Sequence, residues 1–147
     1  MLRVEISRAA LAAIRDHAAS DPTREVCGLL FGSEGRIEAI EQVENVADDP
    51  ARHFEIDPKA LFRAARSERA GGPRLLGYYH SHPSGVAEPS EIDRARAALN
   101  DKLWLVAAGD EVTAWLASTN GLREVSLQLV SEREGLPGDS VSATRPS

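Results

Sequence analysis

The stretch Arg74-Leu75-Leu76-Gly77-Tyr78-Tyr79-His80-Ser81-His82-Pro83 decides how this chain is organised. Its apolar and aromatic residues are typical of a strand, and Pro83 ends the strand because proline has no N–H to donate. Alternate side chains of a strand point to one face and lie about 6.5 to 7 Å apart. We therefore expect His80 and His82 to lie side by side at the end of the strand, where they could hold one metal ion together.

A third metal ligand has to come from another segment, and the following residues offer one. Glu88-Pro89-Ser90 is typical of a helix start, and the alanine-rich run over residues 92–99 favours a helix. Ser90 and Asp93 would then share one helical face. Two histidines and one carboxylate leave a fourth zinc position open, which is typical of a catalytic zinc site rather than a structural one.

Each motif also has a simpler interpretation. Ser90-x-x-Asp93 is a capping box, in which the two side chains satisfy free amides at the start of the helix, and taken alone this is the better interpretation. A lone His-x-His is weak as well, since one imidazole can simply be hydrogen-bonded at the surface. A capping box explains neither the paired histidines nor the turn rich in proline, serine and glycine that joins them to the helix. The two motifs together favour a metal site.

The spacing of these residues resembles the signature of the JAMM (MPN-plus) metallopeptidases, Glu-x(n)-His-Ser/Thr-His-Pro-x6-Ser-x2-Asp. This chain has Glu25, then His80-Ser81-His82-Pro83, six further residues, and Ser90-Glu91-Ile92-Asp93. The run from Glu25 to Gly32 looks like the family's strand with the catalytic glutamate, and the run from His53 to Pro58 looks like the stretch between the two halves of its site. The resemblance covers the chain to about residue 130.

The resemblance implies a role for each of these residues. His80, His82 and Asp93 would hold Zn²⁺, Glu25 would be the general base for a zinc-activated water, and Ser90 would donate its hydroxyl to the oxyanion. These roles agree with the general chemistry of zinc, carboxylates and hydroxyl donors in amide hydrolysis. A glutamate that opens a strand is usually solvated, so the role of Glu25 rests on the resemblance.

The resemblance also bears on the substrate. The family includes enzymes that cut after the Gly-Gly end of ubiquitin, and small prokaryotic members that cut ubiquitin-like sulfur-carrier proteins at the same place. This chain is similarly compact, with one short predicted helix between Asp93 and the strand at Leu103. We therefore expect a zinc metallopeptidase that hydrolyses the peptide or isopeptide bond after a Gly-Gly terminus of a ubiquitin-like or sulfur-carrier protein.

Two other functions stay open, and a third is excluded. The chain could be a catalytically silent interaction scaffold of the same fold, although all five site residues are present, or a zinc hydrolase of other small amides. A zinc nucleoside deaminase would need more cysteine ligands than the single Cys27. We interpret Cys27 as a buried apolar residue rather than a fourth zinc ligand, since a fourth protein ligand would close the site to water.

Composition and charge suit one cytoplasmic enzyme domain. The chain has 147 residues, 42% of them hydrophobic, which is enough for an independent core. Its net charge of −6 argues against a nucleic-acid partner. A single cysteine cannot form an intrachain disulfide, and we find neither a secretory segment nor a membrane-spanning run. We expect no membrane partner, and the sequence does not indicate an oligomeric state.

Apolar patterns predict one domain over residues 1–131, with strands at 2–6, 25–31, 36–43, 74–79, 103–108, 112–118 and 122–130 and further helices from Ser7 and from Pro58. This predicts an α/β class with a mixed sheet sandwiched by helices, and the resemblance implies the cytidine-deaminase-like JAMM/MPN fold. Residues 132–147 lack apolar content, so we predict a disordered tail.

One further pattern lies on the helix predicted over residues 58–69. Lys59, Arg63, Arg66 and Arg69 fall within one stripe of this helix. A solvated face is the default interpretation of such a stripe. The alternative is a docking patch for an acidic partner.

Overall fold

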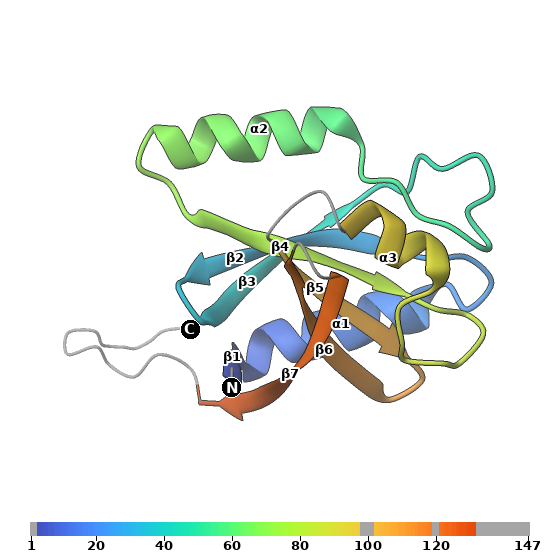
Figure 1. Cartoon of the computed structure of the whole chain (residues 1–147). Helices are drawn as coiled ribbons and strands as arrows, with labels where there is room; N and C mark the ends of the chain where they lie inside the picture. The colour runs from blue at the N-terminus through green and yellow to red at the C-terminus, as the bar shows by residue number, and fades with distance from the viewer. Residues whose placement is uncertain (1–2, 98–101, 119–120, 132–147) are drawn as a thin grey trace.

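The computed structural model describes residues 3–97, 102–118 and 121–131, which form one α/β domain (Figure 1). The described strands are β1 (Arg3–Ser7), β2 (Cys27–Ser33), β3 (Arg36–Val43), β4 (Arg74–Ser81), β5 (Leu103–Ala108), β6 (Glu111–Ser118) and β7 (Gly121–Val130). The described helices are α1 (Arg8–Ser20), α2 (Pro58–Arg69) and α3 (Glu91–Ala97). The tail predicted for 132–147 lies outside the described residues, as do residues 98–99 of the helix predicted over 92–99.

The sheet is mixed, and it closes on itself. β4 runs antiparallel to β2 and parallel to β5. Antiparallel pairs continue from β2 to β3 and from β5 through β6 to β7. β1 completes the circuit because it runs parallel to both β3 and β7. The predicted α/β class with a mixed sheet is thus confirmed, whereas the closure through β1 was not predicted.

Two apolar cores lie on the two faces of the central strands, because neighbouring residues of a strand point to opposite faces. One core packs α1 against the sheet through Ile14, Leu30 and Leu105. The other packs α2 and α3 against it, with Leu29, Trp104 and Trp115 among its members. Both tryptophans therefore fill the core, and helices cover both faces of the sheet (Figure 1).

Local chemistry fixes where two helices start. The Ser7 hydroxyl accepts a hydrogen bond from Ala10 N at 3.1 Å, so it caps α1 as predicted. The Asp57 carboxylate accepts from Lys59 N at 3.0 Å at the start of α2, with Pro58 in the first turn. Among the described helices, none is both long enough and apolar enough to cross a membrane.

β2 and β4 approach each other closely beside the site described below. Gly28 of β2 pairs with Tyr79 of β4. A Cβ atom built on Gly28 would lie 2.3 Å from Cε2 of Tyr79, so glycine is what allows this approach. The contact brings the residues that precede β2 next to the end of β4.

Candidate active site

Two imidazoles meet at the end of β4. His80 is fully buried in the strand, His82 follows directly after it, and their Nε2 atoms lie 3.1 Å apart. Pairing with β5 continues past Ser81, because His82 N donates to Ala107 O at 2.8 Å. The chain therefore stays extended through His82, which places both imidazoles on one face of the sheet.

Asp93 brings a carboxylate to the same point from the first turn of α3. Its Oδ2 lies 2.9 Å from His80 Nε2 and 3.1 Å from His82 Nε2. The ligands of a tetrahedral zinc ion, with bonds of about 2.0 to 2.1 Å, lie roughly 3.3 Å apart. The triangle formed by these three atoms is thus close to the size that one zinc ion requires.

The electrostatics of Asp93 and His80 favour the forms that bind metal. Burial opposes the charge of Asp93, but hydrogen bonds with His80 and His82 outweigh it and hold the pKa of Asp93 well below its usual range. Burial lowers the pKa of His80, which favours neutral imidazole. Burial also lowers the pKa of His82, but its hydrogen bonds with Asp93 and Val86 O have the larger combined effect and raise that pKa overall.

The two imidazoles are held in different ways. His82 Nδ1 lies 2.9 Å from Val86 O, so an N–H there donates to the carbonyl and leaves Nε2 free to face a metal. His80 Nδ1 is buried and has no hydrogen-bond partner among the described residues. The His80 ring instead stacks on Phe54, with centroids 4.2 Å apart and planes inclined by 18°.

Glu25 supplies a second carboxylate from the residues just before β2. One carboxylate oxygen of Glu25 and one ring nitrogen from each of His80 and His82 lie within 4.8 Å of one another. Glu25 is 6% exposed, so the solvated alternative is wrong, and its Oε1 has no hydrogen-bond partner among the described residues. Burial raises the pKa of Glu25 to about 8. A carboxyl group with a pKa near neutrality can both accept and release a proton.

Glu25 does not lie in a strand, although a strand was predicted over residues 25–31. β2 begins at Cys27 rather than at Glu25, because Glu25 N donates to Pro50 O at 2.7 Å and so leaves the ladder of β2. Val26 N donates to the hydroxyl of Ser81 at 2.9 Å. This bond ties the segment that carries Glu25 to the end of β4.

The donor set fits zinc. His80, His82 and Asp93 present two imidazole nitrogens and a carboxylate oxygen, and one carboxylate oxygen of Glu25 lies within 4.8 Å of a ring nitrogen of each histidine. Two histidines and one carboxylate are a common ligand set of catalytic zinc sites. Either carboxylate could be the ligand by chemistry alone, and the short distances to both Nε2 atoms favour Asp93.

Ser90 forms the predicted capping box. Its hydroxyl oxygen accepts from Asp93 N at 3.1 Å, and Asp93 Oδ2 accepts from Ser90 N at 2.9 Å. This Oδ2 atom also faces both imidazoles, so the box positions the carboxylate. The Ser90 oxygen is an acceptor in the box, which leaves its hydroxyl hydrogen to donate to another group. The capping and oxyanion interpretations of Ser90 are therefore compatible.

Cys27 is a core residue. It is fully buried in the apolar cluster that also contains Leu29, and its Sγ lies 3.6 Å from Val43 O. Burial raises the pKa of the Cys27 thiol to about 12. A protonated thiol is a poor metal ligand, which favours the apolar interpretation of Cys27 over a fourth zinc ligand.

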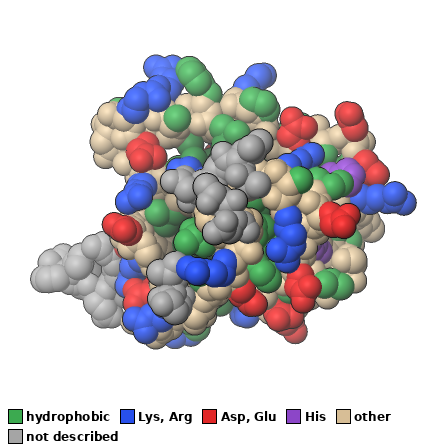
Figure 2. Space-filling model, viewed as in Figure 1, with side chains coloured by type: hydrophobic (Ala, Val, Ile, Leu, Met, Phe, Trp, Pro, Cys, Tyr) green, Lys and Arg blue, Asp and Glu red, His purple; other side chains and the backbone are tan. Residues whose placement is uncertain are grey.

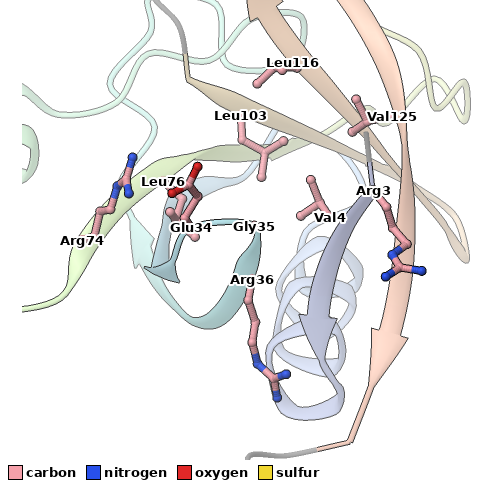
Figure 3. A pocket seen from close by; sticks show the side chains of 10 residues that line it. All are labelled: Arg3, Val4, Glu34, Gly35, Arg36, Arg74, Leu76, Leu103, Leu116 and Val125. Atoms are coloured by element: carbon pink, nitrogen blue, oxygen red, sulfur yellow. The ribbon is translucent and has the colours of Figure 1, made fainter. Parts of the chain in front are cut away.

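Hollows adjoin the site, and another lies far from it. A hollow of about 250 Å³ is lined by residues that include Glu25 and Asn45, and one of about 390 Å³ by residues that include His82 and Gly85. A further hollow of about 250 Å³ lies at the start of β4, where arginines surround an apolar floor (Figure 3). Its lining contains no histidine and a single carboxylate, that of Glu34, so it lacks the groups that hydrolysis needs.

Two neighbours of the site were not assigned a role from the sequence. Phe54 lies in a stretch that resembles the family, but nothing in its local pattern indicates the stack on His80. The side chain of Asn45 binds the backbone of Glu25. The sequence signal at Asn45 is an asparagine two residues after a strand that ends at Val43, and such residues are frequent in ordinary turns.

Proteins of known sequence that are similar to this chain include two desampylases and a conjugate cleaving protease. A desampylase from Haloferax volcanii is 36% identical over 116 residues, which cover 77% of this chain and 84% of that protein. A desampylase from Pyrococcus furiosus is 30% identical over 110 residues, covering 74% and 78%. A probable TtuB-protein conjugate cleaving protease from Thermus thermophilus is 34% identical over 88 residues, covering 60% and 59%.

Solved structures share the fold. A protein from Desulfitobacterium hafniense has a TM-score of 0.76 at 27% identity, covering 89% of this chain and 95% of that one. A structure titled as JAMM, a metalloprotease-like zinc site in the proteasome and signalosome, has a TM-score of 0.56 at 22% identity, covering 88% and 99%. The sequence profile of the prokaryotic homologs of the JAB domain matches residues 7–118, a span that contains all five site residues. The chain therefore belongs to the family of prokaryotic homologs of the JAB domain.

Proposed function

We propose that this protein is a zinc-dependent metallopeptidase that hydrolyses the peptide or isopeptide bond after the Gly-Gly terminus of a ubiquitin-like or sulfur-carrier protein. The observation that carries the proposal is the meeting of His80, His82 and Asp93 beside the Glu25 carboxylate, whose Oε1 has no hydrogen-bond partner in the part of the chain that the structure describes. The relatives named desampylase and conjugate cleaving protease support this substrate class.

In the proposed mechanism, His80, His82 and Asp93 would hold the metal. Zinc, when bound, supplies a Lewis acid that lowers the pKa of water and polarises a carbonyl group. Glu25 takes a proton from the attacking water at a carboxylate oxygen and transfers it to the leaving amine as the C–N bond breaks. Ser90 donates its hydroxyl to the oxygen that becomes negatively charged.

Small residues near the site support a glycine-rich substrate terminus. The hollow beside His82 is lined in part by Ala18, Ala19, Gly85, Ala107 and Gly109. An extended chain can approach a buried site most closely where it lacks Cβ atoms. A Gly-Gly terminus meets this condition, and a bulkier residue at the second position would collide with the surrounding chain.

We also propose that α2 contributes to docking of the substrate protein. Its four basic residues are all exposed, and Lys and Arg side chains gather with hydrophobic ones over α2 at the top of Figure 2. Phe62 is 62% exposed on the same helix, with the Arg66 guanidinium 5.7 Å from its ring centre. Arg63 already pairs with Glu41. An exposed aromatic ring beside exposed cations favours docking of an acidic partner over a purely solvated face.

The docking surface has its own test. Arg66→Glu should raise KM for the protein substrate about tenfold at low salt and leave kcat nearly unchanged, which is the pattern of lost uniform binding. The effect should shrink at high salt, where exposed charges are screened. An unchanged KM would mean that the basic residues of α2 form only a solvated face.

Cleavage of matched substrates tests the reaction. A ubiquitin-like protein extended past Gly-Gly is compared by mass spectrometry with the same protein carrying valine as its second glycine, and both are compared with unrelated short peptides. We expect a cut after the second glycine that slows at least about tenfold with valine. Equal cleavage of all three would indicate a general amide hydrolase, and no cleavage by the zinc-loaded protein would indicate a silent scaffold.

The proposed setting of this activity is the cytoplasm. A chain with one cysteine cannot form an intrachain disulfide, so nothing in it requires an oxidising compartment. The net charge of −6 further supports a protein partner rather than a nucleic acid.

A further inference from the structure

The side-chain amide of Asn45 makes four hydrogen bonds. Its Nδ2 donates to Glu25 O at 2.8 Å and to His53 O at 2.9 Å. Its Oδ1 accepts from Ala47 N and from Glu55 N, both at 3.0 Å. An asparagine amide has two donor hydrogens and two acceptor sites. The capacity of Asn45 is therefore fully used, and all of it is used on backbone.

The first segment that Asn45 binds carries the proposed base. The Glu25 carbonyl accepts from Asn45, and Glu25 N donates to Pro50 O at 2.7 Å. Asn45 and the loop that follows it thus bind both the carbonyl oxygen and the N–H of Glu25. Within the described ranges the Glu25 carboxylate has no hydrogen bond at Oε1, so its position depends strongly on this backbone.

The second segment that Asn45 binds carries the ring beside His80. His53 and Glu55, which flank Phe54, each form one hydrogen bond with the Asn45 amide. Phe54 is 4% exposed and stacks on His80 at a centroid distance of 4.2 Å. Because His80 Nδ1 has no partner among the described residues, ring contacts take the place of the hydrogen bond that usually orients a metal-binding histidine.

A contact from α3 completes this arrangement. Arg96 lies three residues after Asp93 on α3 and donates to Phe54 O. The Phe54 segment is therefore fixed to the helix that carries Asp93 as well as to Glu25. The loop that contains Asn45 and Phe54 therefore contacts the backbone of Glu25, the ring of His80 and the helix that carries Asp93.

We propose that Asn45 is a positioning residue of the active site: its amide fixes the Phe54 ring, and through it the His80 imidazole, relative to Glu25. The roles of Glu25 and His80 as base and ligand rest on the proposed function. Productive sites hold their groups to within about 0.5 Å, and one amide that spans both segments provides such control. An asparagine that only stabilised the loop would affect folding and leave His80 unchanged.

The variant Asn45→Asp separates these two roles. It keeps the size of the side chain and the oxygen that accepts from Ala47 and Glu55. It replaces the Nδ2 donor with an oxygen that faces two carbonyl oxygens, so the links to Glu25 and His53 are lost. Phe54→Leu removes the stacked ring and keeps an apolar side chain. Ser7→Ala removes the N-terminal cap of α1, away from this loop, and is the matched control for general destabilisation.

Two readouts need no substrate. One is the zinc dissociation constant from competition with a chromophoric chelator, and the other is the NMR shift of the His80 ring protons in the metal-free protein. We expect Asn45→Asp and Phe54→Leu to weaken zinc binding by about 10 to 100-fold and to move the His80 resonance, whereas Ser7→Ala changes neither. The double variant should bind zinc no more weakly than the weaker single variant.

Activity then completes the test. With a Gly-Gly substrate, Asn45→Asp should lower kcat at least about tenfold and change KM less than about twofold. The proposal would be overturned if Asn45→Asp lowered the melting temperature but left the zinc affinity and the His80 resonance unchanged. If Asn45→Asp does not fold, unchanged zinc affinity and an unchanged His80 resonance in Phe54→Leu would overturn it instead. If the wild type cleaves no Gly-Gly substrate while the His80 resonance still responds to Asn45→Asp, the proposed function fails and the positioning role stands.

Discussion

The two ends of β4 differ in what they bury. At its start, Arg74 and Leu76 line a hollow with an apolar floor, around which charged side chains stay at the rim (Figure 3). At its end, about 20 Å along the strand, His80 and its polar neighbours are buried together. Burial of ionisable groups costs free energy unless they are paired. The His80 end carries that cost, most clearly at Glu25, and the Arg74 end avoids it. A cavity alone is therefore a weaker sign of catalysis than buried groups that depend on one another.

The largest expected effect comes from a substitution at the His80 end of β4. His82→Ala should lose stoichiometric zinc and reduce cleavage to background, because two protein ligands hold zinc poorly. Arg74→Gln, at the other end of the same strand, should keep both zinc and rate. Elemental analysis and initial rates measure the two outcomes. Stoichiometric zinc in His82→Ala would remove the proposed site.

The second prediction separates the base from the ligands. Glu25→Gln keeps the shape of the side chain but cannot take a proton, so we expect the rate to fall about 10² to 10⁴-fold. Zinc should remain bound, since His80, His82 and Asp93 are intact. Steady-state kinetics with a metal assay on the same sample measures this. A rate within about threefold of wild type would mean that another group moves the proton.

The third prediction concerns the cost of burying Glu25 in metal-free protein. The pKa of Glu25 rises from its model-peptide value of 4.5 to about 8 on folding. The folded state therefore binds the proton more tightly, so its stabilising contribution is present below pH 4.5 and is lost as pH rises through 8. In chemical denaturation near pH 9, the free energy of unfolding of Glu25→Gln should exceed that of wild type, by a few kcal/mol at most. Near pH 5 the difference should be small, and an equal difference at both pH values would contradict this account.

The smallest expected effect concerns the capping box. Ser90→Ala should lower the free energy of unfolding by about 1 kcal/mol, as for other lost caps. It should also slow turnover beyond what this loss of stability explains, because the hydroxyl no longer donates to the oxyanion. Chemical denaturation and kcat are measured on the same preparation. Lower stability with unchanged turnover would leave Ser90 as a cap alone.

The sequence predicted the elements and the ligand motif because both depend on local patterns. The bounds predicted for β3, α2 and β5 match the structure, and His80 and His82 could be paired because the period of a strand is two residues. Closure of the sheet through β1 could not be predicted, since periodicity identifies a buried face but not its partner. Periodicity also could not predict the stack of Phe54 on His80 or the hydrogen bond from Asn45 to Glu25, because these contacts join residues far apart in the sequence.

The assignment of the two carboxylates is the centre of this account, and a crystal structure of the zinc-loaded protein tests it most directly. We predict one anomalous difference peak at the zinc edge, within bonding distance of His80 Nε2, His82 Nε2 and Asp93 Oδ2, with Glu25 outside the bonded atoms. A peak bonded to Glu25 in place of Asp93, or a peak away from the end of β4, would contradict the account.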